Sequence, residues 1–323
     1  MSSNPKFGEN TTADEVVQAF AERVKDRHFA ITGGNSGLGK ESARVLAKAG
    51  GVVYILCRDL AKGEAAKKDI LKETPEAQIS VWKIDLMSLQ SIKEFSDEFI
   101  KTGNPLHVLL NNAGIMACPY AKTKDGFESQ FGTNHIGHFY VTKLLLPVLE
   151  KTGTEEDPAR VVALSSLAND WAPDEGIRFD DLNSEKKYNP WITYGMSKLA
   201  NLLFAFDMHN RKQTKTVDFV SLHPGVISTN LTRDVGCSAA LSFCGARRST
   251  SNVKMGLFDR KSIPEGTATS MVCALDPKIE FGMYYADCQL SQQHHELAFD
   301  KDLAEKLTEV TEKVIAEKLE AQN

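Results

Sequence analysis

Short apolar runs of strand length alternate with amphipathic segments of helix length along most of the chain. Strands are predicted at residues 29–31, 52–56, 79–84, 107–110, 160–164 and 217–222. Helices are predicted at residues 40–49, 61–72, 89–100, 127–149, 194–210 and 300–319. Because apolar strands separated by helices are typical of a parallel sheet covered on both faces, we predict an α/β fold. Right-handed connections make such a sheet doubly wound, with about seven strands flanked by helices.

No internal repeat or low-complexity linker divides the chain, so we predict a single domain. Its parts are an N-terminal extension at 1–26, a body at 27–290 and a C-terminal helical tail at 291–323. The segments at 168–189 and 225–263 are long irregular loops, which in a compact domain are usually functional or mobile. The tail carries an apolar stripe that packs on the body or on a partner subunit, which leaves a homo-oligomer open.

The composition argues against several classes of protein. A net charge of −5 gives no support to nucleic-acid binding, and no apolar run is long enough for a transmembrane segment. The polar N-terminus lacks the features of a signal peptide or an arginine-rich transit peptide. The six cysteines form no C-x-x-C pair and are interpreted as free thiols. These features indicate a cytoplasmic protein in a reducing compartment, with peripheral membrane contact left open.

A glycine-rich turn follows the first predicted strand, with the sequence Thr32-Gly33-Gly34-Asn35-Ser36-Gly37-Leu38-Gly39. Strand, glycine turn and helix are typical of the phosphate-binding end of a Rossmann fold. Glycine lets the backbone approach an anion, and the following helix points its free N–H groups at it. We therefore predict that a dinucleotide cofactor contacts Gly33, Asn35, Ser36, Gly37, Leu38 and Gly39. A tight strand-to-helix turn without a ligand is the alternative.

The residues after the second predicted strand bear on which cofactor is bound. An acidic residue there would favour NAD, but this chain has the neutral Cys57 followed by Arg58. A guanidinium can hold a 2′-phosphate through two hydrogen bonds, so Arg58 favours NADP(H). Asp59 weakens this interpretation, because it could pair with Arg58 as a solvated surface residue.

Two further strand ends offer cofactor contacts. Asp85 and Leu86 follow the third strand, where a carboxylate could contact the adenine amino group, although Asp85 could instead cap the next helix. Asn112, Ala113 and Gly114 follow the fourth strand, where small residues would let a cofactor lie flat over the sheet edge. By itself this run is also consistent with a simple turn.

Tyr194 and Lys198 are four residues apart on a predicted helix and therefore share a face. A lysine ammonium beside a phenol favours the phenolate and lowers the tyrosine pKa. Tyr194 would then be a proton donor to a carbonyl near neutral pH. Ser165 and Ser166 end the fifth strand at the same edge as the glycine turn, where a serine hydroxyl could hold the substrate oxygen. A serine at a strand end could equally cap a loop.

These motifs, in this order, resemble the short-chain dehydrogenase/reductase family. The resemblance rests on TGGNSGLG, NNAG, the Ser165-Ser166 pair, YGMSK and His223-Pro224-Gly225, and it covers roughly residues 27–287. CRDLAKGE, NNAGIMACP, TNHIGHF, YGMSKLANLLF and YYADC are similar to the retinol dehydrogenase branch. That branch includes the plastid translocon-associated dehydrogenases and the oxidoreductase domain of WW-domain-containing oxidoreductase, with protochlorophyllide reductase more distant.

The resemblance implies roles for individual residues. Tyr194 matches the catalytic acid/base, Lys198 the residue that lowers its pKa and binds the nicotinamide ribose, and Ser166 the residue that orients the carbonyl. Asn134 matches the asparagine that holds a water in the proton relay. Ser166 and Tyr194 are 28 residues apart, more than in many members, because of the insertion at 168–189.

The segment over the nicotinamide carboxamide is matched by Pro224, Gly225 and Thr229. Substrate contacts are expected from residues 117–120 and 168–171, Trp191 and the 225–263 loop. Within that loop, the apolar part at 236–250 is interpreted as a lid, as a shallow membrane contact or as an ordinary packed helix turn.

We therefore expect an oxidoreductase that uses NADP(H) to interconvert a small lipophilic carbonyl, such as a retinoid, steroid or fatty aldehyde, and its alcohol. The alternative is an NADP(H)-binding redox-sensing or scaffold protein with little turnover. The intact set of Asn134, Ser166, Tyr194 and Lys198 argues against this alternative. His135 and His138 share a helical face, but no further Cys or His pair completes four zinc ligands, so we predict no metal site.

Overall fold

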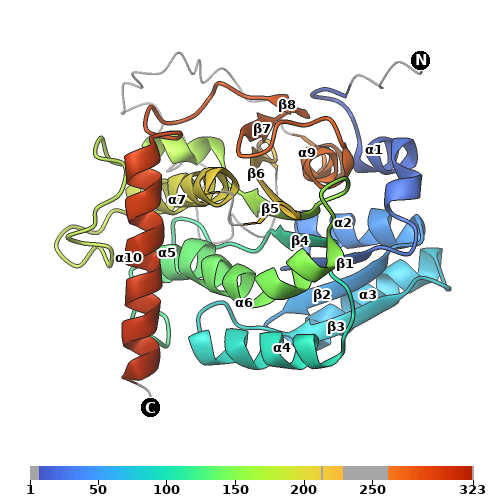
Figure 1. The fold of residues 1–323 in the computed structure, drawn as a ribbon, viewed down its shortest axis with the longest axis horizontal. Coiled ribbons are helices and arrows are strands. Elements are labelled where there is room, and N and C mark those ends of the chain that lie inside the picture. Colours follow the sequence, from blue (N-terminus) through green and yellow to red (C-terminus); the bar gives the residue numbers. More distant parts are fainter. Residues whose placement is uncertain (1–6, 212–213, 228–260, 322–323) are drawn as a thin grey trace.

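The computed structural model describes residues 7–211, 214–227 and 261–321, which fold around one eight-stranded sheet (Figure 1). The strands are β1 (His28–Thr32), β2 (Val52–Cys57), β3 (Ile79–Lys83), β4 (Val108–Asn111), β5 (Ala159–Leu164), β6 (Val217–His223), β7 (Tyr284–Ala286) and β8 (Gln289–Leu290). Their order is β3-β2-β1-β4-β5-β6-β7-β8, and every neighbouring pair is parallel except β7 and β8. The predicted single-domain, doubly wound Rossmann fold is confirmed, with a short antiparallel strand added at one edge.

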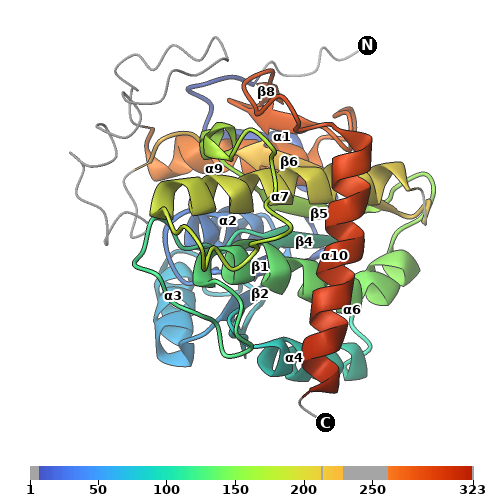
Figure 2. The same ribbon diagram turned by 90° about the vertical axis from the view of Figure 1, so that its left-hand side faces the viewer.

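Helices cover both faces of the sheet (Figure 1 and Figure 2). One face carries α1 (Ala13–Ala19), α2 (Gly37–Lys48), α3 (Leu60–Glu73) and α9 (Ile263–Leu275). The other carries α4 (Leu89–Lys101), α5 (Ser129–Phe131), α6 (Gly137–Thr152), α7 (Pro190–Asn210) and α10 (Lys301–Glu320). Side chains alternate along β1. Phe29 and Ile31 therefore pack in the hydrophobic core beneath α1, α2, α3 and α9, and Ala30 packs in the core on the other face of the sheet.

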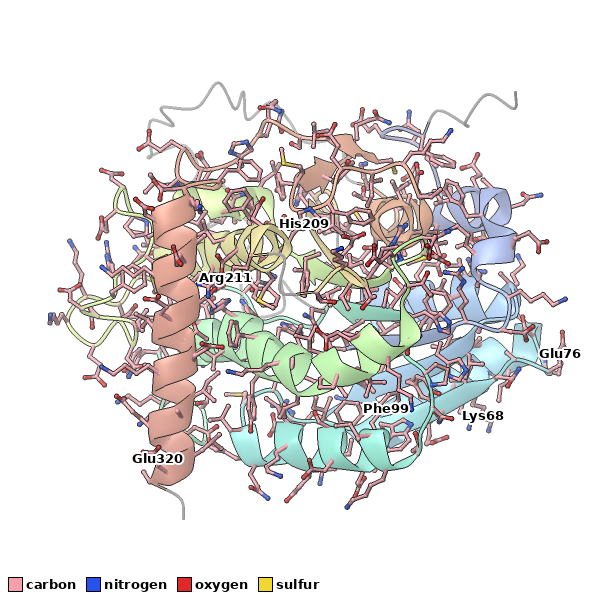
Figure 3. All side chains as sticks on the ribbon, viewed as in Figure 1. Lys68, Glu76, Phe99, His209, Arg211 and Glu320 are labelled. Atoms are coloured by element: carbon pink, nitrogen blue, oxygen red, sulfur yellow. The ribbon has the colours of Figure 1, made fainter. Side chains whose placement is uncertain are left out.

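Side chains between the helices and the sheet are buried, and those on the outer surface are exposed (Figure 3). Phe99 of α4 is fully buried and meets Tyr54 of β2 edge-on, with ring centroids 5.0 Å apart. Lys68 of α3 and Glu76 are exposed at the outer surface. Within residues 7–211, 214–227 and 261–321, no helix combines the length and the apolar character that a bilayer crossing requires.

Several elements differ from the predictions, and α1, β7 and β8 are not among the predicted elements. The helix predicted at 127–149 consists of α5, a π-helix termed η2 (Gly132–Ile136) and α6. Helix α7 begins at Pro190 rather than Tyr194, because Asn189 caps it and proline fits the first turn. Helix α9 is not among the predicted elements, because nearly all its residues are buried and no polar face marks a helical period.

The C-terminal helix α10 packs across α7 on the second face (Figure 1 and Figure 2). Its apolar stripe buries Leu307 and Ile315. The Thr308 hydroxyl donates a 2.5 Å hydrogen bond to the carboxylate of Asp207 in α7. The predicted amphipathic helix therefore docks on the body of its own chain.

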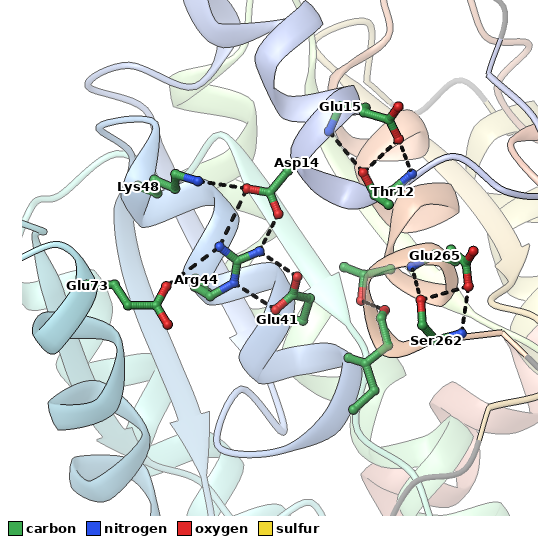
Figure 4. A network of polar contacts seen from close by, with 11 residues as sticks. Thr12, Asp14, Glu15, Glu41, Arg44, Lys48, Glu73, Ser262 and Glu265 are labelled. Atoms are coloured by element: carbon green, nitrogen blue, oxygen red, sulfur yellow. Dashed lines mark hydrogen bonds and ion pairs between the residues drawn. The ribbon is translucent and has the colours of Figure 1, made fainter.

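The N-terminal helix α1 packs on α2 and α9, next to a network of charged side chains (Figure 4). A capping box between Thr12 and Glu15 begins the helix. Arg44 of α2 forms ion pairs with Asp14 of α1 and, at 2.7 Å, with Glu41. The guanidinium therefore joins the N-terminal extension to the helix that follows the glycine turn.

Candidate active site

The site is built at the carboxyl ends of β1 and β4. These strands are neighbours in the sheet although β2 and β3 lie between them in the chain, and ligands of this fold bind where the strand order reverses in this way. The Asn112 side chain donates a 2.7 Å hydrogen bond to the Thr32 carbonyl. The Thr32 hydroxyl accepts the backbone N–H groups of Asn112 (2.9 Å) and Ala113 (3.0 Å). These bonds join the glycine turn to the loop after β4.

The glycine turn has the geometry of an anion-binding loop. Gly33 and Gly37 have positive φ angles of 65° and 53°, which glycine adopts without strain. A Cβ on Gly39 would lie 2.5 Å from the Asn112 side-chain nitrogen and would collide with the Gly33 carbonyl oxygen. Ser36 is the N-cap of α2 but makes no side-chain capping bond, so the first N–H groups of the helix have no side-chain acceptor within the described part of the chain. This cradle fits the diphosphate of a dinucleotide. The other predicted contacts from this turn are Asn35 and Leu38.

Arg58 follows β2 and is exposed. Its guanidinium lies 3.9 Å from the Met87 sulfur and forms no ion pair with any residue that the structure describes. The neighbouring Asp59 is instead the N-cap of α3, where it accepts the N–H of Lys62 at 3.2 Å. The alternative in which Arg58 and Asp59 neutralise each other is therefore not found, and the guanidinium is open to an anionic group.

Asp85 lies at the end of β3 and is largely buried. Its carboxylate accepts the N–H of Met87 at 3.1 Å and pairs with Lys124 at 3.1 Å. It does not cap α4, because Ser88 occupies that position. Leu86 beside it is also largely buried. The contact of this pair with adenine stays a prediction.

Tyr194 of α7 is buried next to Ser166, and the two side chains share a hydrogen bond. A Cβ on Gly195 would lie 2.7 Å from the Ala168 carbonyl oxygen, so only glycine lets the short helix η3 (Leu167–Trp171) approach α7 this closely. The Ser166 hydroxyl also accepts the Ala168 N–H at 3.1 Å as the N-cap of η3. Ser166 therefore both caps the loop and reaches the tyrosine.

Burial sets the pKa values of Tyr194 and Lys198. It raises the pKa of Tyr194 to about 12, and the hydrogen bond to Ser166 opposes this effect. It lowers the pKa of Lys198 to about 8. The Lys198 ammonium donates a 2.9 Å hydrogen bond to the Leu164 carbonyl and lies 5.7 Å from the centre of the Tyr194 ring. The lowered pKa expected for Tyr194 is not found, because the loss of hydration dominates in this buried position.

Asn134 lies in the π-helix η2 and is fully buried. Its Oδ1 accepts the Ile115 N–H at 2.9 Å, and its Nδ2 donates to the Ile115 carbonyl and the Ser197 hydroxyl, both at 3.0 Å. A Cβ on Gly114 would lie 3.2 Å from Asn134 Oδ1 and 3.6 Å from Lys198 Nζ. Asn134, Gly114 and Lys198 therefore meet at one point, and π-helical turns are frequent at functional sites.

The segment after β6 lies at the same edge. His223, the last residue of β6, accepts the Leu167 N–H at 3.2 Å, and burial lowers its pKa to about 3, so the imidazole is neutral. Pro224 and Gly225 follow it directly. Thr229 and the predicted loop segment at 236–250 lie outside the described residues.

The two histidines of η2 and α6 have structural partners. His138 bonds to the Thr32 hydroxyl and the Asn134 carbonyl, each at 2.9 Å, and His135 bonds to the Thr311 hydroxyl at 3.1 Å. Burial lowers the pKa values of His135 and His138 to about 3 and about 4, which keeps both rings neutral. Among the described residues, no group of three or more His, Cys, Asp or Glu side chains could hold a metal ion.

Thr32, His138 and Ser197 support the site but are not among the predicted residues. Each is polar and buried next to apolar neighbours of its strand or helix. Buried polar groups need hydrogen-bond partners, so a polar residue inside an apolar run is the signal that could have identified them.

Comparison with known proteins gives consistent matches. A family model for short chain dehydrogenases matches residues 27–176. Retinol dehydrogenase 12 of Mus musculus is 43% identical over 271 residues, which cover 83% of this chain and 79% of that protein. The chloroplastic short-chain dehydrogenase TIC 32 A of Brassica napus is 38% identical over 316 residues, covering 96% of this chain and 94% of that protein. A crystal structure of an uncharacterized protein from Mycobacterium paratuberculosis superposes with a TM-score of 0.69 at 33% identity, covering 91% of this chain and 96% of that one.

Proposed function

The chain belongs to the short-chain dehydrogenase/reductase family, in its retinol dehydrogenase-like branch, and from this premise we propose that it interconverts a lipophilic carbonyl compound and its alcohol with NADP(H). Membership of the family makes it an oxidoreductase of CH–OH and C=O groups that binds a nicotinamide cofactor. The choice of NADP(H), the substrate class, the roles of individual residues and a cytoplasmic location belong to the proposal.

One observation carries the proposal. Tyr194, Ser166, Lys198 and Asn134 are all buried or half-buried at one sheet edge, beside a glycine turn that fits a diphosphate. Burying this many polar groups is costly unless they are paired or used, which favours a working acid/base site over a scaffold. Arg58 supports NADP(H), because its exposed guanidinium has no carboxylate partner among the described residues and suits a 2′-phosphate.

The bound nicotinamide would supply or accept the hydride. Ser166 donates a hydrogen bond to the substrate oxygen and holds it against Tyr194. During reduction, the Tyr194 hydroxyl gives its proton to that oxygen, and the Lys198 ammonium stabilises the phenolate that remains. Asn134 holds η2 against the loop at Ile115, which keeps the region beside the ammonium ordered. In oxidation, the same groups act in the reverse order.

A lipophilic substrate is supported by the aromatic side chains near this edge. Trp171 follows Ser166 on η3 and packs edge-on against Trp191 of α7, with ring centroids 5.8 Å apart. Tyr120, on the loop that runs out from Gly114, is 42% exposed. Exposed aromatic surface near a reaction centre favours a substrate with an apolar body.

The test is NADPH consumption with a panel of aldehydes and ketones, comparing the wild type with Tyr194→Phe. We expect turnover of at least one apolar carbonyl and a loss of roughly a hundred-fold or more in Tyr194→Phe. The matched control is Tyr54→Phe, because Tyr54 bonds to His28 at the amino end of β1, whereas the site lies at the carboxyl ends of the strands, so turnover should stay unchanged. If NADPH binds but the wild type reduces no carbonyl, the redox-sensing alternative replaces the enzyme.

A further inference from the structure

Gln130 is a fully buried side chain that joins three separate segments near the proposed site. It lies on α5, one helical turn before Asn134. Its Oε1 accepts the Ala117 N–H at 2.7 Å, and its Nε2 donates to the Tyr188 hydroxyl and to the Pro190 carbonyl, both at 3.0 Å. The partners fix the orientation of the amide, because a backbone N–H can only donate and a carbonyl can only accept.

Tyr188 completes this arrangement. Its hydroxyl accepts from Gln130 and donates a 2.6 Å hydrogen bond to the Cys118 carbonyl. Its ring packs edge-on against Tyr120, with centroids 5.1 Å apart. An ion pair at 2.5 Å joins Lys122, two residues after the first loop, to Glu185 in the second. Contacts between the loop at residues 115–120 and the loop at residues 184–190 therefore extend from the buried Gln130 amide to the surface.

The conformation of the first loop needs this support. Ala117 has a φ angle of 48°, which is unfavourable for a residue with a Cβ. Such a conformation persists only where surrounding contacts impose it, and the hydrogen bond from its N–H to Gln130 is one of these contacts. The loop is thus fixed at two points on adjacent helical turns, at Ile115 by Asn134 and at Ala117 by Gln130.

The position of these loops connects them to the chemistry. The first loop directly follows Gly114, which lies beside Lys198, and ends at the exposed Tyr120. The second leads into α7, whose first residue, Pro190, lies one helical turn before Tyr194. Both loops therefore adjoin residues of the proposed site, the first at Lys198 and the second at Tyr194.

We propose that Gln130 and Tyr188 are positioning residues that lock the 115–120 and 184–190 loops into one rigid wall, and that this wall selects carbonyl compounds with a bulky apolar body. The selection rests on the proposed function, whereas the locking does not. A small carbonyl needs only Ser166 and Tyr194, but a bulky one also needs a wall whose shape is fixed before binding.

The first experiment compares Tyr188→Phe and Gln130→Met with the wild type, using retinal as a bulky aldehyde and propanal as a small one. We expect KM for retinal to rise roughly tenfold, the scale set by the loss of buried hydrogen bonds. We expect kcat for retinal, kcat/KM for propanal and the Kd for NADPH to stay within about twofold. Matched controls are Tyr54→Phe, which removes a tyrosine hydroxyl bonded to His28 outside both loops, and Gln90→Met on the exposed face of α4. Equal losses of kcat/KM for retinal and propanal in the two variants, or no loss for either aldehyde, would refute the proposed selection of bulky carbonyl compounds.

The second experiment follows amide hydrogen exchange and requires no turnover. In both variants, amides of the 115–120 and 184–190 loops should exchange roughly tenfold faster or more, while those of α4 keep the wild-type rate. Unchanged exchange in the two loops refutes the locking. If the wild type reduces neither retinal nor propanal, the proposed function and the selection fail together, and the exchange rates alone decide the locking.

Discussion

Replacing Arg58 by alanine is expected to weaken NADPH binding and to leave NADH binding nearly unchanged. The guanidinium is exposed after β2, forms no ion pair with the described residues, and donates a hydrogen bond to the Met87 sulfur at 3.9 Å. The only carboxylate next to it in the chain, that of Asp59, is engaged as the N-cap of α3. The substitution therefore removes one free cation and disturbs no internal ion pair among these residues.

The size of the effect follows from the interaction that is lost. A hydrogen bond to a charged group contributes about 1.5–3 kcal/mol net, and an exposed position lies toward the lower half of that range because solvent screens it. A loss of about 2 kcal/mol corresponds to a rise of roughly 30-fold in the Kd for NADPH. Because the site is exposed, the difference should shrink as the salt concentration rises.

The assay is titration of the protein with each cofactor, followed by nicotinamide fluorescence at low and high salt. Lys101→Ala, which removes an exposed positive charge at the end of α4, controls for net charge. Arg58→Lys keeps the charge without the paired N–H donors of the guanidinium. Its Kd for NADPH should fall between those of the wild type and Arg58→Ala. Equal weakening of NADH and NADPH, or no weakening of NADPH, would refute the assignment of Arg58 to a 2′-phosphate.

Three other substitutions test other parts of the structure. Gly39→Ala places a Cβ 2.5 Å from the Asn112 amide, so binding of both cofactors should fall at least tenfold in titrations, with the circular dichroism spectrum retained. Burial lowers the pKa of Lys198 to about 8, and the ammonium is present below this pH and lost above it. Reductive turnover should therefore decline as the pH rises through about 8, and Lys198→Met should remove that inflection from the pH profile. Arg44→Ala leaves the half-buried Glu41 without its partner and should lower the free energy of unfolding by about 1–2 kcal/mol in urea. Glu73→Gln, at a 65% exposed carboxylate 3.9 Å from Arg44, should change stability little.

Several elements could be predicted because their signal is local. The apolar run at 52–56 corresponds to β2, and the amphipathic stretch at 89–100 corresponds to α4 within one residue at its end. Helix α9 could not be found by periodicity, because it is buried on almost every side. Its Ser262–Glu265 capping box was the readable sign of its start. The three-residue β7 is a strand because β6 and β8 pair with it.

Some features of the candidate site could likewise be predicted from local patterns, and others could not. The glycine turn and the Tyr194–Lys198 spacing are local patterns, and the structure brings both to one edge of the sheet. The π-helical turn at Asn134 could not be predicted, since it depends on how η2 packs against the Ile115 loop. The shift of the Tyr194 pKa depends on burial, which no spacing of residues in the chain determines.

Local patterns of residues predict the alternation of strands and helices, the glycine turn and the residue types available for proton transfer. These features depend on contacts between residues a few positions apart, whose geometry is fixed by the backbone of one strand, turn or helix. Contacts between distant segments bring Gly114 and Asn134 next to Lys198 and let Gln130 join two loops that are far apart in the chain. Those outcomes arise from close packing between segments far apart in the chain, where burial and hydrogen-bond partners are set together.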